Sequence, residues 1–131
     1  MSQVKIGDTV EEKRAFSEDD VIAFSRICGD TNPIHLDETY AQTTRFRKRI
    51  VHGLLTASTI SALIGTKLPG PGAIYLRQSL EFKAPIFIGE EVVCRVTVKS
   101  GKERLLHLET RCTKTDGTIA LDGTADVLTS R

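Results

Sequence analysis

Apolar residues change their spacing once along the chain, near residue 70. Before that point they recur at helical intervals, and from residue 73 onward they alternate with polar residues, as in strands with one buried face. Residues typical of turns break the alternating part into segments. The pattern predicts a mainly helical first half, followed by strands over 73–83, 90–99, 104–114 and 118–129.

Two pairs of turn residues predict hairpins between these strands. Asp116-Gly117 separates two alternating segments and favours a tight turn, and Ser100-Gly101 is a second turn signal. One further strand, of mixed polarity, is expected over 9–16. The strand-rich part is therefore expected to form a mainly antiparallel sheet.

The first helix, expected to end at Cys28, has recognisable termini. Ser17 offers a side-chain oxygen at an N-cap position, and three acidic residues follow it in the first turn, where the helix dipole favours negative charge. Gly29 can end the helix in the left-handed conformation. Asp30 is therefore expected just beyond a helix terminus.

Proline stiffens the next segment. Pro33 cannot continue a helix and biases Asn32 toward an extended conformation, so residues 30–35 are expected to form a loop with restricted backbone freedom. A short helix is expected over 37–42.

The segment 54–68 is apolar on nearly every side, which predicts a buried helix. With 131 residues, the chain is expected to form one domain over 1–131. The expected fold class is α+β, with one long central helix wrapped by a strongly curved, mainly antiparallel sheet.

Charge and composition narrow the classes of function. Lys plus Arg number 18 and Asp plus Glu number 17, so no overall field attracts nucleic acid or an anionic membrane. The first residues lack the apolar core of a signal peptide, and no apolar run approaches the length of a membrane span. A cytoplasmic protein without nucleic-acid or membrane partners is expected.

The cysteines predict neither a disulfide framework nor a zinc site. Cys28, Cys94 and Cys112 are odd in number and lack C-x-x-C spacing. All three are expected to be small apolar residues in a reducing compartment.

Candidate acid/base chemistry is concentrated in residues 30–35. A water that adds to an activated double bond needs one group to take its proton and another to deliver a proton to the neighbouring carbon, and Asp30 with His35 could do both. Asn32 could add a hydrogen bond to water or substrate. Alternatively, Asp30 and Asn32 cap the turn and His35 is a satisfied, semi-buried residue.

Other residues offer supporting roles, each with a structural alternative. The Gly53 N–H, at a helix N-terminus, could stabilise a developing enolate oxygen, or the glycine could simply allow a tight turn. Ser61 could face a cavity or bond back to its own helix. His52 is expected to be structural, and His107 to be exposed on a strand.

A local group of basic residues could bind the phosphates of a ligand through charge-assisted hydrogen bonds, or could lie on a solvated loop. The candidates are Arg45, Arg47, Lys48 and, further along the chain, Lys83.

Three segments together resemble the MaoC-like hydratases, most of all the single-domain R-specific enoyl-CoA hydratases that supply polyhydroxyalkanoate synthesis. They are Asp30-Thr31-Asn32-Pro33-Ile34-His35, Ile50-Val51-His52-Gly53 and the segment 75–85, which reads YLRQSLEFKAP. The resemblance covers nearly the whole chain, from about Val4 to Leu128. The chain departs from the family pattern at Arg49, where members usually carry proline.

The resemblance implies a hotdog fold, a homodimer and an acyl-CoA substrate, with no cofactor and no metal. By motif match, Asp30 and His35 would activate the water that adds across a trans-2-enoyl thioester, giving an R-3-hydroxyacyl product. Asn32 would support them, the Gly53 N–H would polarise the thioester carbonyl, and Ser61 would line the substrate site.

Three alternatives remain open from the sequence. The chain could be a dehydratase of acyl-carrier-protein thioesters or of short, branched or carboxylated acyl-CoA. It could be a hotdog thioesterase, although residues 54–64 contain no Asp or Glu to direct water at a carbonyl. It could also be a binding module that retains the fold without the chemistry.

Overall fold

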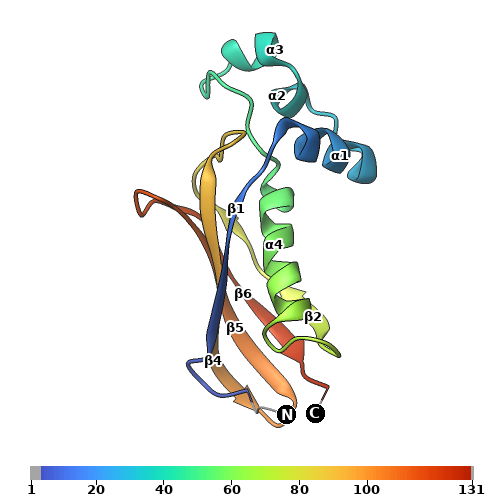
Figure 1. Cartoon of the computed structure of the whole chain (residues 1–131), viewed down its shortest axis with the longest axis vertical. Helices are drawn as coiled ribbons and strands as arrows, with labels where there is room; N and C mark the ends of the chain where they lie inside the picture. Colours follow the sequence, from blue (N-terminus) through green and yellow to red (C-terminus); the bar gives the residue numbers. More distant parts are fainter. Residues whose placement is uncertain (1–3, 131) are drawn as a thin grey trace.

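A computed structural model describes residues 4–130 of the chain, which form a curved sheet, one long helix and three shorter helices (Figure 1). In chain order the elements are β1 (Thr9–Ala15), α1 (Glu18–Cys28), α2 (Pro33–Leu36), α3 (Glu38–Gln42), α4 (Gly53–Thr66), β2 (Ile74–Gln78), β3 (Glu81–Phe82), β4 (Glu91–Lys102), β5 (Leu105–Lys114) and β6 (Ile119–Leu128).

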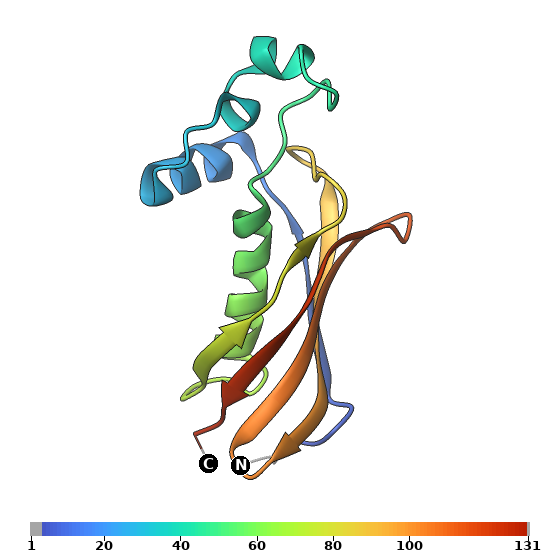
Figure 2. The same cartoon turned by 180° about the vertical axis from the view of Figure 1, so that it is seen from behind.

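The strands form one antiparallel sheet. Its order is β1-β4-β5-β6-β2, and the short β3 also pairs with β6. Helix α4 lies along one face of this curved sheet, while α1, α2 and α3 gather beyond one end of it (Figures 1 and 2). This is the expected α+β arrangement, with a central helix inside a curved sheet.

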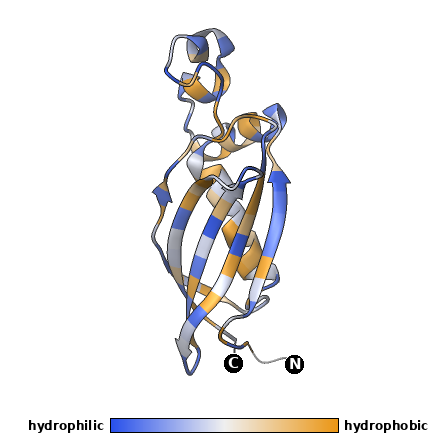
Figure 3. Cartoon of the chain, turned by 90° about the vertical axis from the view of Figure 1, so that its left-hand side faces the viewer, coloured by the Kyte–Doolittle hydropathy of each residue, from blue (hydrophilic) through white to orange (hydrophobic). Residues whose placement is uncertain are grey.

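The core lies between α4 and the sheet. Residues of β4 alternate between buried and more exposed positions up to Val98, and those of β5 do the same up to Cys112. Figure 3 shows hydrophobic and hydrophilic residues along these strands. Ile60, Leu63 and Ile64 of α4 pack in the same cluster as the buried residues of the strands. Burial of this apolar surface is the main favourable contribution to folding.

Two expected strand boundaries differ in the structure. The segment 73–83 forms two strands, β2 and β3, which are interrupted at residues 79 and 80, although the Ser79 N–H still donates to the Thr124 carbonyl of β6 at 2.8 Å. The turn after β4 falls at Glu103 and Arg104 instead of Ser100-Gly101: a register shift after Val98 lets the strand continue, and Glu103 adopts the positive φ. The predicted turn at Asp116-Gly117 is present, with Gly117 at φ 90°.

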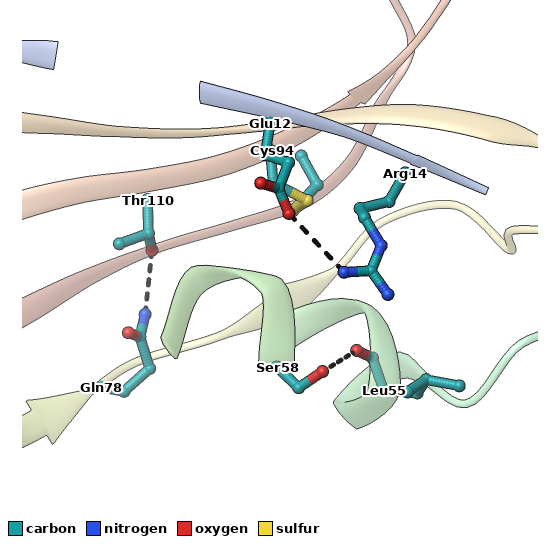
Figure 4. The surroundings of a disulfide bond; sticks show 8 residues. Glu12, Arg14, Leu55, Ser58, Gln78, Cys94 and Thr110 are labelled. Carbon is teal, nitrogen blue, oxygen red and sulfur yellow. Dashed lines mark hydrogen bonds and ion pairs between the residues drawn. A yellow bond between two sulfur atoms is a disulfide. The ribbon is translucent and has the colours of Figure 1, made fainter. Parts of the chain in front are cut away.

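The expectation of three unpaired cysteines is wrong for two of them. Cys94 of β4 and Cys112 of β5 are directly opposite in register, fully buried, and joined in a disulfide beside Glu12 and the start of α4 (Figure 4). Spacing in the sequence carries no information on strand register, which is why this pairing was not predicted. Cys28 is free and exposed.

Helix α4 is less buried than its composition predicts. Its sheet-facing side is buried, but Leu54 is 61% exposed, and Ser58, Ser61 and Ala62 are also exposed. One face of this largely apolar helix is therefore left exposed by the single chain. Within residues 4–130, no helix is both long enough and apolar enough to cross a membrane.

Candidate active site

The end of α1 places Asp30 at the mouth of a cavity. Ser17 and Asp20 form a capping box at the start of this helix, and Gly29 ends it with φ 82°, in the left-handed region that favours glycine. Asp30 then turns out of the helix. Its side chain is 52% exposed, and its Oδ1 accepts a hydrogen bond of 3.1 Å from the Asn32 N–H.

The segment expected to be a loop contains a single helical turn. Asn32 is extended, as predicted before proline, but Pro33 then begins α2 because its fixed φ and missing N–H suit the first helical position. The Asn32 side chain caps this turn by accepting a hydrogen bond from the Ile34 N–H at 3.2 Å. His35 therefore projects from a short helix and not from an irregular loop.

His35 is held in one orientation and one tautomer. Its Nδ1 lies 2.8 Å from the carbonyl oxygen of Ile50, and because a carbonyl only accepts, Nδ1 carries the hydrogen. Nε2 of this buried ring is left facing Asp30, whose Oδ2 is 3.9 Å away. This distance is too long for a direct hydrogen bond but allows one water oxygen to contact both groups.

His52 supports both members of this dyad. Its ring stacks on His35 with centroids 3.8 Å apart, and its Nε2 donates to the carbonyl oxygen of Asp30 at 3.2 Å, with Ser25 Oγ also 3.0 Å away. Phe24 packs against it edge-on. These contacts, mostly from α1 and α2, agree with the structural role expected for His52, whereas its stacking on His35 was not expected.

Burial lowers the pKa of His52 below its ordinary value. Desolvation is the largest cause, the hydrogen bond to Asp30 opposes it, and the neighbouring His35 lowers the pKa further. Nδ1 of His52 is buried and has no hydrogen-bond partner among residues 4–130. His52 is thus a neutral imidazole near neutral pH, and His35 is the imidazole placed to exchange protons with Asp30 or water.

A cavity of about 540 Å³ opens beside the dyad. It brings together Asp30, His35 and Gly53 with two of the basic candidates, Arg45 and Lys83. Its apolar lining includes Phe24, Leu54, Phe82 and Leu121. This combination of apolar walls and few polar groups is typical of a small-molecule site.

Gly53 begins α4, and the ring of Phe82 occupies the space that a side chain would need here. A Cβ at this position would lie 2.5 Å from Cε1 of Phe82 and 2.6 Å from Cδ1. The first N–H groups of a helix have no partner within it, so the start of α4 offers donors toward the cavity.

Four predicted site residues lie outside the cavity lining. Ser61 is on the exposed face of α4, and Asn32 is engaged in capping α2. Arg47 and Lys48 lie on the exposed loop before α4, and the Lys48 ammonium sits 5.5 Å from the ring centre of Phe87.

The dyad and His52 also form a compact group of metal-ligating residues. One ligand atom from each of Asp30, His35 and His52 can be chosen so that all lie within 4.8 Å of one another. Stacked imidazoles, however, direct their in-plane lone pairs side by side and not toward a common point. The arrangement therefore suits proton transfer better than coordination of an ion.

Known proteins share both the sequence and this architecture. Residues 2–119 match the MaoC like domain, and the chain therefore belongs to the MaoC-like family. It is 45% identical to an (R)-specific enoyl-CoA hydratase of Rhodospirillum rubrum, over 95% of this chain and 88% of that protein. It is also 45% identical to a 3-hydroxybutyryl-CoA dehydratase of Methylorubrum extorquens, over 93% and 78% of the two chains.

A solved structure extends the similarity to three dimensions. The (R)-hydratase of Aeromonas caviae involved in PHA biosynthesis matches with a TM-score of 0.95 and 40% identity, over 98% of this chain and 99% of that one. The predicted family and the hotdog fold are thus confirmed. The chain is a member of a group of hydro-lyases acting on acyl thioesters.

Proposed function

We propose that this chain catalyses the reversible, R-specific hydration of trans-2-enoyl-CoA to (R)-3-hydroxyacyl-CoA. The observation that carries the proposal is the pair His35 Nε2 and Asp30 Oδ2, 3.9 Å apart at a cavity that also receives the start of α4. The R configuration is proposed from the similarity to two R-specific hydratases.

The geometry supports a single-water mechanism. A water held between Asp30 and His35 loses a proton to one of them as its oxygen bonds to C3 of the enoyl group. C2 receives a proton from the dyad, so the net change is addition of H and OH across the double bond. Both proton transfers are assigned to the dyad as a whole.

The start of α4 is proposed to stabilise the negative charge that develops on the thioester oxygen. As water adds, electron density moves onto the thioester oxygen, and the Gly53 N–H is placed to donate to that enolate oxygen. Because Asp30 and His35 are fixed through separate hydrogen bonds before substrate arrives, little reorganisation is needed during the reaction.

Basic residues at the cavity mouth are proposed to hold CoA. Arg45 and Lys83 line the cavity and can contact phosphate groups. Arg47 and Lys48 lie on the same loop as Arg45 and would extend this surface along the nucleotide part of the substrate. We expect no metal and no additional cofactor.

A homodimer is part of the proposal. Apolar side chains are exposed on strand β2, which forms an edge of the sheet, and on the adjacent start of α4. These are Leu54, Ile74, Tyr75 and Leu76, between 39% and 61% exposed. An uncovered strand edge flanked by such residues fits a second copy of the chain. Ser61, on the exposed face of α4, would contribute to a substrate site only in such an assembly.

The expected location of the protein is the cytoplasm.

A carrier-protein substrate is the second candidate. The chain is 36% identical to a mitochondrial 3-hydroxyacyl-[acyl-carrier-protein] dehydratase of Solanum lycopersicum, over 95% of this chain and 77% of that protein. Both thioesters share the same reacting atoms and differ only in what the cavity mouth must hold. Competition between crotonyl-CoA and crotonyl-carrier protein for the same enzyme separates the two.

The thioesterase alternative has little support. Helix α4, Gly53–Thr66, carries no Asp or Glu beside the cavity. The dyad instead comes from the segment between α1 and α3, where it can reach a double bond beyond the carbonyl. Release of free thiol from crotonyl-CoA at a rate similar to hydration would revive that alternative.

The test is hydration of crotonyl-CoA, followed by loss of the conjugated enoyl-thioester absorbance and by an R-specific 3-hydroxyacyl-CoA dehydrogenase assay. We expect rapid hydration by the parent and a loss of about two to four orders of magnitude in kcat for His35→Ala, with a nearly unchanged melting temperature. Parent-like turnover by the double variant Asp30→Asn/His35→Ala would exclude the assigned dyad. A folded parent that hydrates neither CoA nor carrier-protein thioesters would favour a binding module.

A further inference from the structure

Arg49 bridges two elements of the active site. Its side chain is only 10% exposed and lies in the segment that leads to α4. Nε donates to the main-chain carbonyl of His35 at 2.9 Å, and Nη1 donates to Oε1 of Glu18 at 2.7 Å. One guanidinium thus connects the turn that bears His35 to the first turn of α1.

The two hydrogen bonds of Arg49 are expected to contribute unequally to the position of His35. The bond to the His35 carbonyl is charge-assisted and partly buried, so losing it would leave a carbonyl near the end of α2 without this donor. Glu18 is 61% exposed, so its pairing with Arg49 contributes mainly by orienting the guanidinium.

Residues 49 and 50 together hold both the main chain and the ring of His35. Arg49 holds its main-chain carbonyl, and the Ile50 carbonyl accepts from its Nδ1 at 2.8 Å. The Ile50 N–H also donates to the carbonyl of Ile34 at 3.2 Å. The short turn α2 also contacts α1 and α3, and the ring of His52 stacks on His35, but the hydrogen bonds to the His35 carbonyl and to its Nδ1 come from residues 49 and 50.

We propose that Arg49 is a positioning residue that maintains the alignment of His35 Nε2 with Asp30. It does not touch the reacting atoms. Without it, α2 gains freedom to move away from residues 49 and 50, and the gap between Nε2 and the carboxylate is no longer held at the length of a water bridge. This proposal rests on the proposed hydratase function for its kinetic readout.

The test compares four single variants and one double variant by kcat, KM and melting temperature with crotonyl-CoA. Arg49→Met keeps the length of the side chain and removes every donor, Arg49→Lys keeps the charge, and Glu18→Gln removes only the charge of the partner. Arg26→Met, an exposed arginine on α1, is the matched control.

Arg49→Met is expected to lower kcat about 10- to 100-fold, as a misplacement of a catalytic group by about 1 Å can, with KM within about twofold of the parent. Arg49→Lys is expected to recover part of this loss, Glu18→Gln to lose about two- to fivefold, and Arg26→Met to match the parent. Because Glu18 acts through Arg49, adding Glu18→Gln to Arg49→Met should cause no further loss.

A spectroscopic measurement tests the same inference without turnover. In protein labelled with ¹⁵N-histidine, His35 should give the signals of a single Nδ1–H tautomer in the parent, and averaged tautomers in Arg49→Met. Parent-like kcat, or an unchanged His35 spectrum in both Arg49 variants, would refute the inference. If the parent hydrates neither CoA nor carrier-protein thioesters, the proposed function fails while the spectrum still decides the role of Arg49. If Arg49→Met does not fold, Arg49→Lys and Glu18→Gln decide it.

Discussion

The buried, neutral His52 should make the stability of this protein depend on pH in a defined direction. Its pKa in the folded chain is below the ordinary value of 6.5, mainly because burial disfavours the charged ring. Between those two values the unfolded chain binds more protons than the folded one. The stabilisation is therefore fully present above pH 6.5 and is lost as the pH falls from there toward the lowered pKa.

The size of the effect follows from proton linkage. One proton bound only by the unfolded state changes the free energy of unfolding by about 1.4 kcal/mol per pH unit. Between about pH 7.5 and about pH 5.5, His52 can thus account for at most about 1.4 kcal/mol, because the change begins only near its unfolded pKa. This is a measurable share of the roughly 5–15 kcal/mol that stabilises a typical domain.

The assay is urea unfolding of the parent and of His52→Gln, at both pH values and at one fixed protein concentration. The glutamine amide can still donate to the carbonyl of Asp30 but does not titrate. His52→Phe serves as a second variant, which keeps a ring against His35 and loses the hydrogen bond. We expect both variants to lose less unfolding free energy on acidification than the parent, by up to about 1.4 kcal/mol.

Equal pH dependence in the parent and in both variants would refute this account of His52. The absolute stability of the two variants need not agree, since His52→Phe leaves the Asp30 carbonyl without its donor. Only the difference between the two pH values isolates the imidazole.

Three other predictions concern the cavity and the core. Gly53→Ala should lower kcat/KM at least about 10-fold, because the added methyl meets the Phe82 ring at the cavity wall, and steady-state kinetics with a normal circular dichroism spectrum would check it. Arg45→Met with Lys83→Met should raise KM for crotonyl-CoA by about 10-fold with little effect on crotonyl-pantetheine, which lacks the nucleotide; equal effects on both substrates would contradict phosphate binding. Leu108→Ala, at a side chain only 1% exposed, should cost about 2–5 kcal/mol by urea unfolding, and a cost below about 1 kcal/mol would argue against its core position.

Local signals in the sequence were sufficient for much of the fold. The N-cap at Ser17, the left-handed Gly29 and the turn at Asp116-Gly117 all occur as predicted, because each depends on residues within a few positions of one another. The boundary near Ser100 was wrong because a register shift between two strands moved the turn onward to Glu103.

In the site, too, contacts between residues near in sequence were predictable and contacts between distant segments were not. Asp30 and His35 are close in sequence, and their meeting at one cavity agrees with the motif. The stacking of His52 on His35, the bridge made by Arg49 to Glu18, and the pairing of Cys94 with Cys112 each join segments that are distant along the chain. No spacing rule predicts such contacts, since they follow from how elements pack.

The separation of the small helices from the sheet has a consequence for how this protein can change over evolution. The dyad and its supports come from residues 17–52, beyond the end of the sheet, whereas the strands 91–128 supply most of the buried core (Figure 1). Substitutions at exposed positions of the first region can alter the reaction while leaving the scaffold intact, and substitutions in the second, away from cavity residues such as Leu121, can tune stability without touching the chemistry. Such a division lets one scaffold acquire new thioester reactions by rebuilding a single peripheral segment.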